Sequence, residues 1–284
     1  MKNNVHILKN DFAPKKVLLI SDIHWDNPHC NRELLKKHLD QALAIEADIL
    51  FNGDTFCLMQ GAYDPRKSKN DIRPEHNKTN YLDAVINDAI DWFSPYAHLI
   101  KVIGYGNHET NILKRAETDV IDRFVFGLNS KNGTNVEVGG YGGWIVYNFR
   151  NGDGYGGMAA FKIRYYHGTG GGGIVTKGVI SFNRMSSFVE GADMIWMGHV
   201  HEDHELTYTI ESLNTQNRVK LKDILMVRTP TYKEEYQEGT GGWHVERGAP
   251  PKPLGGRWLE VHPERVRKGD KETVRVNAFT YKTL

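Results

Sequence analysis

The amino-acid sequence predicts an α/β fold, on three observations. Short apolar runs typical of buried strands alternate with segments whose apolar residues recur at helical spacing. Their order in the first third of the chain is strand, helix, strand, helix, strand, which favours crossover connections. The 284 residues are 39% hydrophobic and 25% charged, values ordinary for a globular protein with a substantial core.

Each expected strand is a short apolar run that ends in polar residues or glycine. Five such runs lie at residues 16–21, 48–52, 99–104, 162–167 and 193–198. Helices are expected at residues 31–47, with Asn31 as a candidate N-cap, and at 81–93, because the apolar residues of each segment share one face.

The rest of the chain indicates loops and antiparallel β structure. Residues 61–80 are polar and are expected to form a structureless surface loop or lid. Residues 130–178 are rich in glycine, and the segments 144–149 and 158–166 within them alternate like the strands of a hairpin. From about residue 205 onward, four further β segments are expected to pair antiparallel. Without an internal repeat or a domain boundary, we expect a single domain over residues 1–284, with the polar loop at about 61–80 as an insertion.

Charge and cysteine content narrow the class of protein. Lys plus Arg number 36 and Asp plus Glu 35, and this balance argues against a broad basic face that binds nucleic acid. Cys30 and Cys57 form no CxxC pair, so a disulfide scaffold is not expected. No uninterrupted run of about 18 apolar residues occurs, and the first residues lack the apolar core of a signal peptide. We therefore expect a cytoplasmic protein that does not enter a membrane.

Polar motifs stand at the ends of all five expected strands. Ligands of open α/β sheets bind beyond the carboxyl ends of the strands, so these side chains are expected to meet at one edge. The candidate ligands are Asp22, His24, Asp54, Asn107, His167, His199 and His201. Asp22 and His24 are two residues apart, as are His199 and His201, and in an extended chain the members of each pair point the same way.

This mixture of donors indicates a metal centre. Imidazole, carboxylate and amide oxygen without thiolate suit manganese, iron, zinc, cobalt or nickel. The donors are too many for one ion but would serve two if Asp54 bridges them. The expected cofactors are two divalent metal ions, with manganese ranked first.

The motifs DIH (22–24), GD (53–54), GNHE (106–109), HG (167–168) and GHVH (198–201), in this order, resemble the signature of the calcineurin-like metallophosphoesterases. The resemblance spans about two thirds of the chain. It implies a β-sandwich of two mixed sheets flanked by helices, in four layers. It also implies two ligand sets that share Asp54, namely Asp22, His24, Asp54 and His201 for one ion and Asp54, Asn107, His167 and His199 for the other. By the same resemblance, His108 is the catalytic acid beside the leaving group.

The sequence departs from the family pattern after Asp54. The family motif usually continues GDxxD or GDxxN, and in many members that side chain orients the catalytic histidine. Cys57 stands at that place here, so the partner of His108 is left open, with Asp64, Asp71 and Glu109 as candidates. Glu109 has an equal alternative as a cap of the helix that follows. Leu58 stands where the protein serine/threonine phosphatases carry an arginine, which disfavours that branch.

The ligand charges suit an anionic substrate. Two divalent ions carry +4, Asp22 and Asp54 carry −2 and a bridging hydroxide carries −1, which leaves +1 to attract a phosphate ester. The hydroxide would attack in line while His108 protonates the departing oxygen.

The expected function is therefore that of a metal-dependent phosphoesterase. A phosphodiester of a nucleic acid or nucleotide is preferred over a small phosphomonoester, and a non-catalytic metal-binding scaffold is the alternative from another class. Aromatic and basic residues that could stack on a base are Trp25, Tyr105, Trp243 and Arg247. Arg66, Lys67, Lys69 and Arg73 form either a solvated loop surface or contacts to substrate phosphates.

Overall fold

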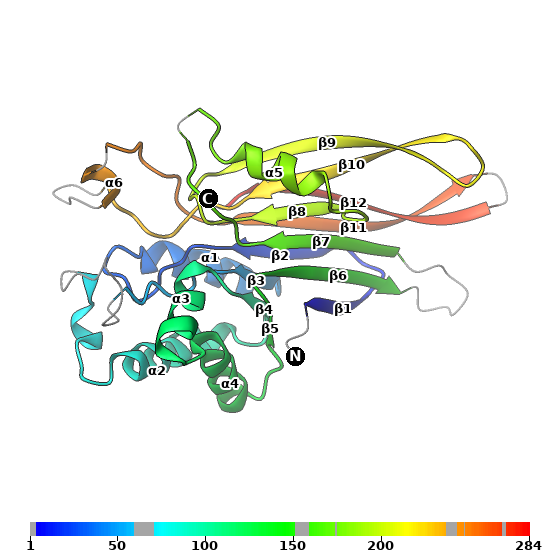
Figure 1. The fold of residues 1–284 in the computed structure, drawn as a ribbon. Coiled ribbons are helices and arrows are strands. Elements are labelled where there is room, and N and C mark those ends of the chain that lie inside the picture. Colours follow the sequence, from blue (N-terminus) through cyan, green and yellow to red (C-terminus); the bar gives the residue numbers. More distant parts are fainter. Residues whose placement is uncertain are drawn as a thin grey trace.

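The computed structural model describes residues 4–59, 71–150, 159–173, 175–236, 243–246, 248–268 and 271–284. Two mixed sheets of six strands each stack face to face, and helices cover their outer faces (Figure 1). The predicted fold class, an α/β sandwich of two mixed sheets flanked by helices, is confirmed.

One sheet contains the predicted alternation of strands and helices. Its order is β12-β11-β2-β3-β4-β5. Strands β2, β3, β4 and β5 are parallel neighbours, and β11 pairs antiparallel with both β2 and β12. The strands are β2 (Lys15–Ile20), β3 (Asp48–Asn52), β4 (Ile100–Gly104), β5 (Glu137–Val138), β11 (Arg257–Lys268) and β12 (Lys271–Lys282). Helix α1 (Arg32–Ala44) connects β2 to β3, and α2 (Tyr81–Phe93) lies between β3 and β4. The Asn31 side chain accepts the Leu34 N–H at 2.9 Å, which confirms the predicted N-cap.

The second sheet has the order β1-β6-β7-β8-β10-β9. Its strands are β1 (Val5–Asp11), β6 (Gly142–Arg150), β7 (Ala159–Tyr166), β8 (Met194–Met197), β9 (His204–Leu213) and β10 (Val219–Arg228). β6 and β7 form the predicted antiparallel hairpin, whereas β7, β8 and β10 are parallel neighbours. The C-terminal strands pair antiparallel within β9–β10 and β11–β12 as expected, but the two hairpins belong to different sheets.

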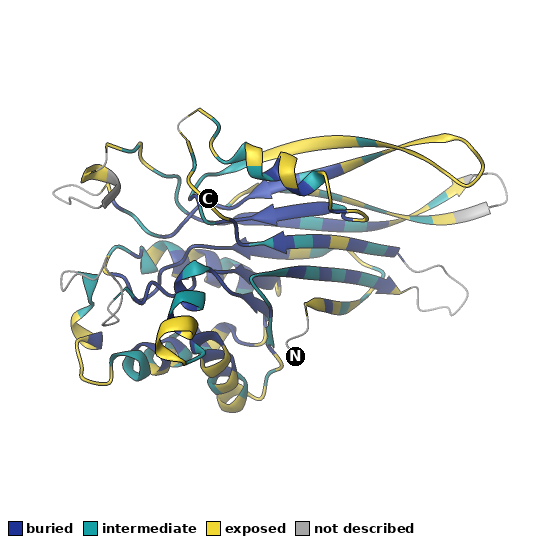
Figure 2. Ribbon diagram, viewed as in Figure 1, coloured by how far each residue is buried: buried dark blue, intermediate teal, exposed yellow. Residues whose placement is uncertain are grey.

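Three apolar clusters bind the layers together, and the most buried segments run through the middle of the molecule (Figure 2). Between the sheets, Val17 and Leu50 pack with Tyr147 and Trp196. The outer face of the first sheet packs against α1, α2 and α4 (Val120–Asn132). The outer face of the second sheet packs against α5 (Val179–Ser186), through Phe182 and Met185.

Short helices occupy part of the segment expected to be structureless. Residues 60–70 lie outside the described part, but residues 71–80 carry a turn of 3-10 helix at Pro74–His76, and His76 is buried against Trp25. The expectation of a structureless loop is therefore wrong only for the helical turn at Pro74–His76. The other short helices are a 3-10 turn at Ser94–Tyr96, α3 (Asn107–Ala116) and α6 (Trp243–Glu246). None of the helices in the described ranges is long and apolar enough to cross a membrane.

Candidate metal centre

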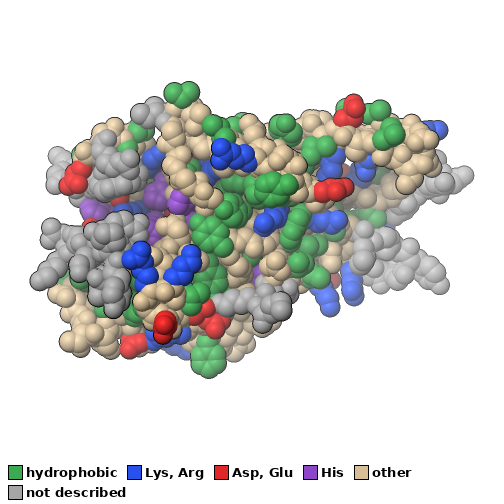
Figure 3. All heavy atoms as spheres, in the orientation of Figure 1, with side chains coloured by type: hydrophobic (Ala, Val, Ile, Leu, Met, Phe, Trp, Pro, Cys, Tyr) green, Lys and Arg blue, Asp and Glu red, His purple; other side chains and the backbone are tan. Residues whose placement is uncertain are grey.

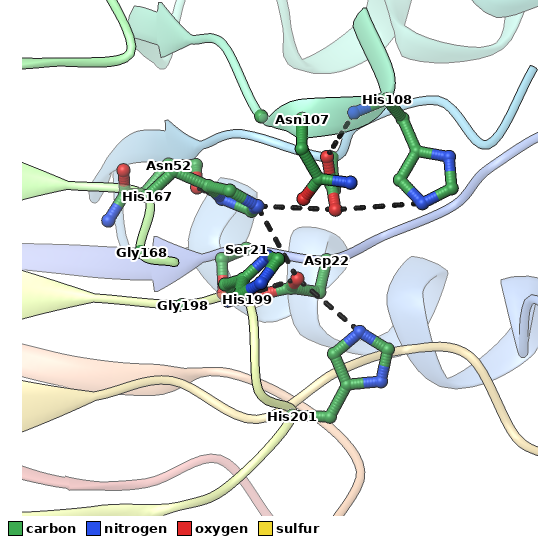
Figure 4. A network of polar contacts seen from close by, with 12 residues as sticks. Ser21, Asp22, Asn52, Asn107, His108, His167, Gly168, Gly198, His199 and His201 are labelled. Atoms are coloured by element: carbon green, nitrogen blue, oxygen red, sulfur yellow. Dashed lines mark hydrogen bonds and ion pairs between the residues drawn. The ribbon is translucent and has the colours of Figure 1, made fainter. Parts of the chain in front are cut away.

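The predicted ligands meet at one end of the sandwich, where strands of both sheets terminate. The loops after β2, β3 and β4 come from one sheet and those after β7 and β8 from the other. Figure 4 shows the side chains of Asn107, His108, His167, His199 and His201 converging on a region next to Asp22. Histidines also gather at one end of the molecular surface, near the level at which the sheets meet (Figure 3). The site therefore lies at the paired ends of two stacked sheets rather than at the edge of a single open sheet.

Asp22, His24 and His201 form the first group of potential ligands. Each offers a ligand atom, and these atoms lie within 4.8 Å of one another. Nε2 of His201 is 3.4 Å from Oδ1 of Asp22 and 3.4 Å from Nε2 of His24. The Ser21 hydroxyl and the His199 backbone N–H donate to the Asp22 carboxylate, so its orientation is fixed from the protein side.

Asp54, His167 and His199 form the second group, again within 4.8 Å. Nε2 of His167 lies 3.2 Å from Oδ2 of Asp54 and 4.0 Å from Oδ1 of Asp22, so the two groups adjoin. Nδ1 of His167 donates to the carbonyl of Asn52 at 2.7 Å, which turns Nε2 toward the carboxylates. Metal-binding histidines commonly have their other ring nitrogen hydrogen-bonded to the protein in this way.

Besides Nε2 of His167, which faces the Asp54 carboxylate, three buried polar atoms of the predicted ligands have no hydrogen-bond partner among the described residues. They are Nδ1 of His24, Oδ1 of Asn107 and Nδ1 of His199. Buried polar atoms in native proteins are nearly always paired, and those that are not require an ion, a water or a functional role. All three belong to the predicted ligand set. Their nitrogen and oxygen chemistry fits a pair of divalent cations.

Burial and neighbouring side chains together set the ionisation of the predicted ligands. Burial alone would raise the pKa of Asp54, but His167 and His108 outweigh it and hold that pKa well below the usual value. Asp22 behaves similarly, because His201 and His167 overcome the effect of burial and lower its pKa. Burial, aided by His108, holds the pKa of His24 well below its usual value. Both carboxylates are therefore ionised and His24 is neutral, which are the states in which these groups bind metal.

Five of the seven predicted ligands have a left-handed backbone. Their φ angles are 52° at Asp22, 50° at His24, 48° at Asp54, 72° at His199 and 57° at His201. This region is unfavourable for residues other than glycine, and such strain clusters at functional sites. The expectation that Asp22–His24 and His199–His201 lie in extended chain is wrong. Tight turns bring these side chains together, while the intervening Ile23 and Val200 are buried.

Glycines allow the ligand loops to approach one another. Gly53 has a φ of +81°, and a Cβ there would lie 2.6 Å from Nδ1 of His167 and from the backbone nitrogen of Gly106. A Cβ on Gly106 would collide with the carboxylate and backbone of Asp54. The glycines of the GD and GNHE motifs are thus required by packing.

Glu109 supports the loop that carries Asp54. Its fully buried carboxylate accepts the N–H of Gly106 at 2.8 Å, which caps α3, and the N–H groups of Asp54 and Phe56 at 3.2 and 2.9 Å. Burial and the nearby Asp54 raise its pKa to about 8, against the opposing effect of these amides. The sequence left Glu109 either to orient His108 or to cap the helix that follows. These contacts are those of a residue that caps the helix and fixes the loop at Asp54.

His108 begins α3 beside the two ligand groups. Its backbone N–H donates to Oδ1 of Asp54 at 3.1 Å, and Nε2 lies 3.9 Å from Oδ2 of the same carboxylate. Nδ1 donates to the backbone carbonyl of Cys57 at 2.5 Å. Among the candidate orienting residues, Glu109 is engaged by backbone amides and Asp64 lies outside the described residues.

Two supporting residues were not predicted from the sequence. Asp26, in the same strand-end motif as Asp22, is buried and binds the loop at Cys57 and Leu58. Arg228, at the end of β10, is buried and donates to the carbonyl of Gly198, just before His199. The available signals were the place of Asp26 at the end of the segment SDIHWD and that of Arg228 directly after the apolar run 224–227.

The predicted base-stacking residues are not exposed where the structure describes them. Trp25 is 0% exposed and packs against Trp92 and Phe93, while Tyr105 is 4% exposed, so stacking on a substrate base is wrong for both. The Trp243 side chain and Arg247 lie outside the described residues.

The basic residues near the polar loop are only partly described. Arg73 donates to the carbonyls of Asn27 and Cys30 and so anchors the chain next to α1 rather than forming a solvated surface. Arg66, Lys67 and Lys69 fall outside the described part, as does Ile174 after the glycine run.

No protein-family model matches this chain, and no curated protein matches it. The solution NMR structure of Thermotoga maritima protein TM1076 is similar, with 10% identity, a TM-score of 0.30 and coverage of 93% of this chain and 99% of that one. So is GAP50, the anchor in the inner membrane complex of Plasmodium, with 9% identity, a TM-score of 0.43 and coverage of 95% and 88%. At these scores neither likeness bears on function.

Proposed function

We propose that this protein is a binuclear metal-dependent phosphoesterase of the calcineurin-like type. The observation that carries the proposal is the pair of adjoining donor groups, Asp22–His24–His201 and Asp54–His167–His199, each within 4.8 Å. Unpartnered buried donors of His24, Asn107 and His199 and the left-handed backbone of five ligands support it.

Asp54 is the proposed shared ligand. It lies in the second donor group, and Nε2 of His167 in that group is 3.2 Å from Oδ2 of Asp54 and 4.0 Å from Oδ1 of Asp22 in the first. One ion would be held by Asp22, His24, Asp54 and His201. The other would be held by Asp54, Asn107, His167 and His199.

Two bound divalent ions supply Lewis-acid stabilisation of the phosphate and activation of a water nucleophile near neutral pH. The chain's own residues set the charge: Asn107 is neutral, so the centre keeps a net positive unit toward an anionic ester. His108 holds its Nε2 edge on the Asp54 side of the centre, 3.9 Å from that carboxylate, where it would pass a proton to the departing oxygen. We propose a phosphodiester, as in a nucleic acid or nucleotide, as the preferred substrate class.

The test is hydrolysis of bis-p-nitrophenyl phosphate and p-nitrophenyl phosphate by protein loaded with Mn²⁺. Turnover of the diester at the higher kcat/KM is the expected result. Faster cleavage of the monoester would indicate a phosphomonoesterase instead. No turnover of either ester with any divalent ion would refute the enzyme and leave a metal-binding scaffold as the function.

Matched variants at the two ends of β3 sharpen this test. Asp54→Asn changes the proposed shared ligand, whereas Asp48→Asn changes a buried aspartate at the opposite end of the strand, 3.0 Å from the Lys15 ammonium. Activity that disappears in the first variant and persists in the second assigns the chemistry to this centre. Equal activity in both would exclude it.

A further inference from the structure

One partner of the His108 ring is a backbone carbonyl, whose position depends on the peptide that carries it. Nδ1 of His108 lies 2.5 Å from the oxygen of Cys57. The thiol of Cys57 does not hold the carbonyl in place. Its sulfur accepts a hydrogen bond from the Asn27 amide at 3.4 Å, and burial raises the pKa of the thiol.

The other end of the same peptide group is bound by a carboxylate. The carbonyl of Cys57 and the N–H of Leu58 belong to one peptide, and that N–H donates to Oδ2 of Asp26 at 2.9 Å. Oδ1 of Asp26 accepts the N–H of Cys57 at 2.5 Å, and the Tyr81 hydroxyl donates to Oδ2 at 2.7 Å. Asp26 is 1% exposed, so these contacts are shielded from water.

The peptide is held in a strained turn. Leu58 has a φ of 49°, a left-handed conformation that is unfavourable for a bulky residue. Two charge-assisted hydrogen bonds from Cys57 and Leu58 to one carboxylate offset that strain and fix the plane of the peptide. The carbonyl oxygen is thereby aimed at the imidazole of His108.

A peptide group also transmits polarisation. A negative charge at its N–H end pushes electron density away from the nitrogen and toward the carbonyl oxygen. The oxygen thereby becomes a stronger hydrogen-bond acceptor. The carboxylate of Asp26 thus acts on Nδ1 of His108 without touching it.

We propose that Asp26 is the positioning residue of His108 and acts through the Cys57–Leu58 peptide. Its catalytic consequence rests on the proposed phosphoesterase function, whereas its structural consequence does not. Because a carbonyl can only accept, the peptide requires the hydrogen of neutral His108 to sit on Nδ1. Nε2 then faces the centre, and it carries the proton to be donated when the ring is protonated to imidazolium.

The tautomer of His108 tests the structural half in metal-free protein. Imidazole ¹⁵N shifts of histidine-labelled wild type, with His108 assigned by its absence in His108→Asn, are expected to show the Nδ1–H form. Asp26→Asn, in which the amide cannot accept from both N–H groups as the carboxylate does, is expected to shift His108 toward the Nε2–H form. Asp48→Asn, the matched buried aspartate, should leave the His108 shifts unchanged. Identical His108 shifts in Asp26→Asn and wild type would overturn the proposal.

Tyr81→Phe keeps this test decisive if Asp26→Asn does not fold. Loss of one of the hydrogen bonds at the carboxylate loosens Asp26 without altering either amide contact. A partial shift of the His108 signals in the same direction is expected. Signals that stay at their wild-type positions would contradict the proposed link.

Leaving-group dependence tests the catalytic half in metal-loaded protein. Protonation matters for an alkoxide leaving group but little for p-nitrophenolate. Asp26→Asn is therefore expected to lower kcat about tenfold or more for a dinucleoside monophosphate, which expels a nucleoside alkoxide, within the range of general acid catalysis. Cleavage of bis-p-nitrophenyl phosphate should fall much less, at unchanged metal content.

The outcomes of this experiment separate the two proposals. Equal losses on both esters would reduce Asp26 to a structural role and overturn its catalytic assignment. Absence of turnover of either ester in wild type would instead refute the phosphoesterase, with the tautomer result still standing.

Discussion

Strand β3 carries a buried aspartate at one end and another just beyond its opposite end, and the two have different surroundings. Asp48 lies 3.0 Å from the Lys15 ammonium and 3.7 Å from that of Lys101, so fixed cations balance its charge. Asp54 faces histidines and a second carboxylate, on a left-handed backbone. Burial alone therefore does not distinguish a structural aspartate from a candidate ligand.

The contrast extends to whole ends of the sandwich. Around Asp48, the ammonium groups of Lys15 and Lys101 supply charges of opposite sign. Around Asp54, one potential metal-ligand atom each of His24, Asn107 and His199 lacks a hydrogen-bond partner among the described residues. Buried nitrogen and oxygen atoms that the chain itself leaves unpaired are what a cation site requires.

The largest effect is expected from removing the proposed shared ligand. Asp54→Asn should lower kcat/KM for the diester by on the order of 10³-fold or more, because it removes a negative ligand from both ions. Bound metal, measured by plasma mass spectrometry, should fall in parallel. Asp48→Asn is expected to keep both the metal and the activity. Loss of metal in that variant would contradict the distinction between a structural Asp48 and a metal-binding Asp54.

His108→Ala separates proton donation from metal binding. The variant is expected to retain both ions and to lose about 10²–10⁴ in rate on an ester with an alkoxide leaving group. Metal content and kcat on the same sample are the measurements. Full activity in this variant would show that another group protonates the departing oxygen.

Gly106→Ala tests whether packing dictates the glycine of the GNHE motif. The added methyl would meet Asp54, and overpacking of this kind typically costs about 1–3 kcal/mol in the free energy of unfolding. Urea denaturation measures the change. Gly171→Ala, where nothing lies within 4 Å of the added methyl, is the control and should unfold as wild type does. Equal stability of the two variants would contradict the tight approach of these loops.

His38 offers the smallest effect, away from the ligand groups. Burial, aided by Lys37, lowers its pKa to about 4, and its Nδ1 contacts the Tyr232 hydroxyl at 2.9 Å. The unfolded chain takes up a proton near the ordinary histidine pKa of about 6.5 while the folded protein does not until about 4, so this group's contribution to stability is lost as pH falls through that interval. The difference between the urea-unfolding curves of wild type and His38→Gln over this range should show that slope. A pH-independent difference would contradict it.

The sequence predicted the regular elements well where periodicity was strong. β2, β3, β4 and α2 begin and end within one residue of the expected segments. A helix after Glu109 was anticipated without bounds, whereas α4, α5 and β1 were not, because they are short or of mixed polarity and are stabilised by tertiary packing. The membership of the two C-terminal hairpins in different sheets depends on long-range pairing that local pattern does not encode.

The candidate ligands could be named from the sequence because each follows an apolar run. How they converge could not, since the left-handed turns at Asp22 and His199 replace the extended chain that spacing suggested. The contact of His108 with the Cys57 carbonyl was also out of reach, because a backbone oxygen leaves no signal in the side-chain pattern. Trp25 shows the converse error, since an aromatic next to a motif proved to be core.

Anomalous diffraction from crystals of Mn²⁺-loaded protein tests the central claim most directly. The account predicts two anomalous peaks on either side of Asp54, one among Asp22, His24 and His201 and the other among Asn107, His167 and His199. A single peak, or none at this end of the sandwich, would contradict a binuclear centre.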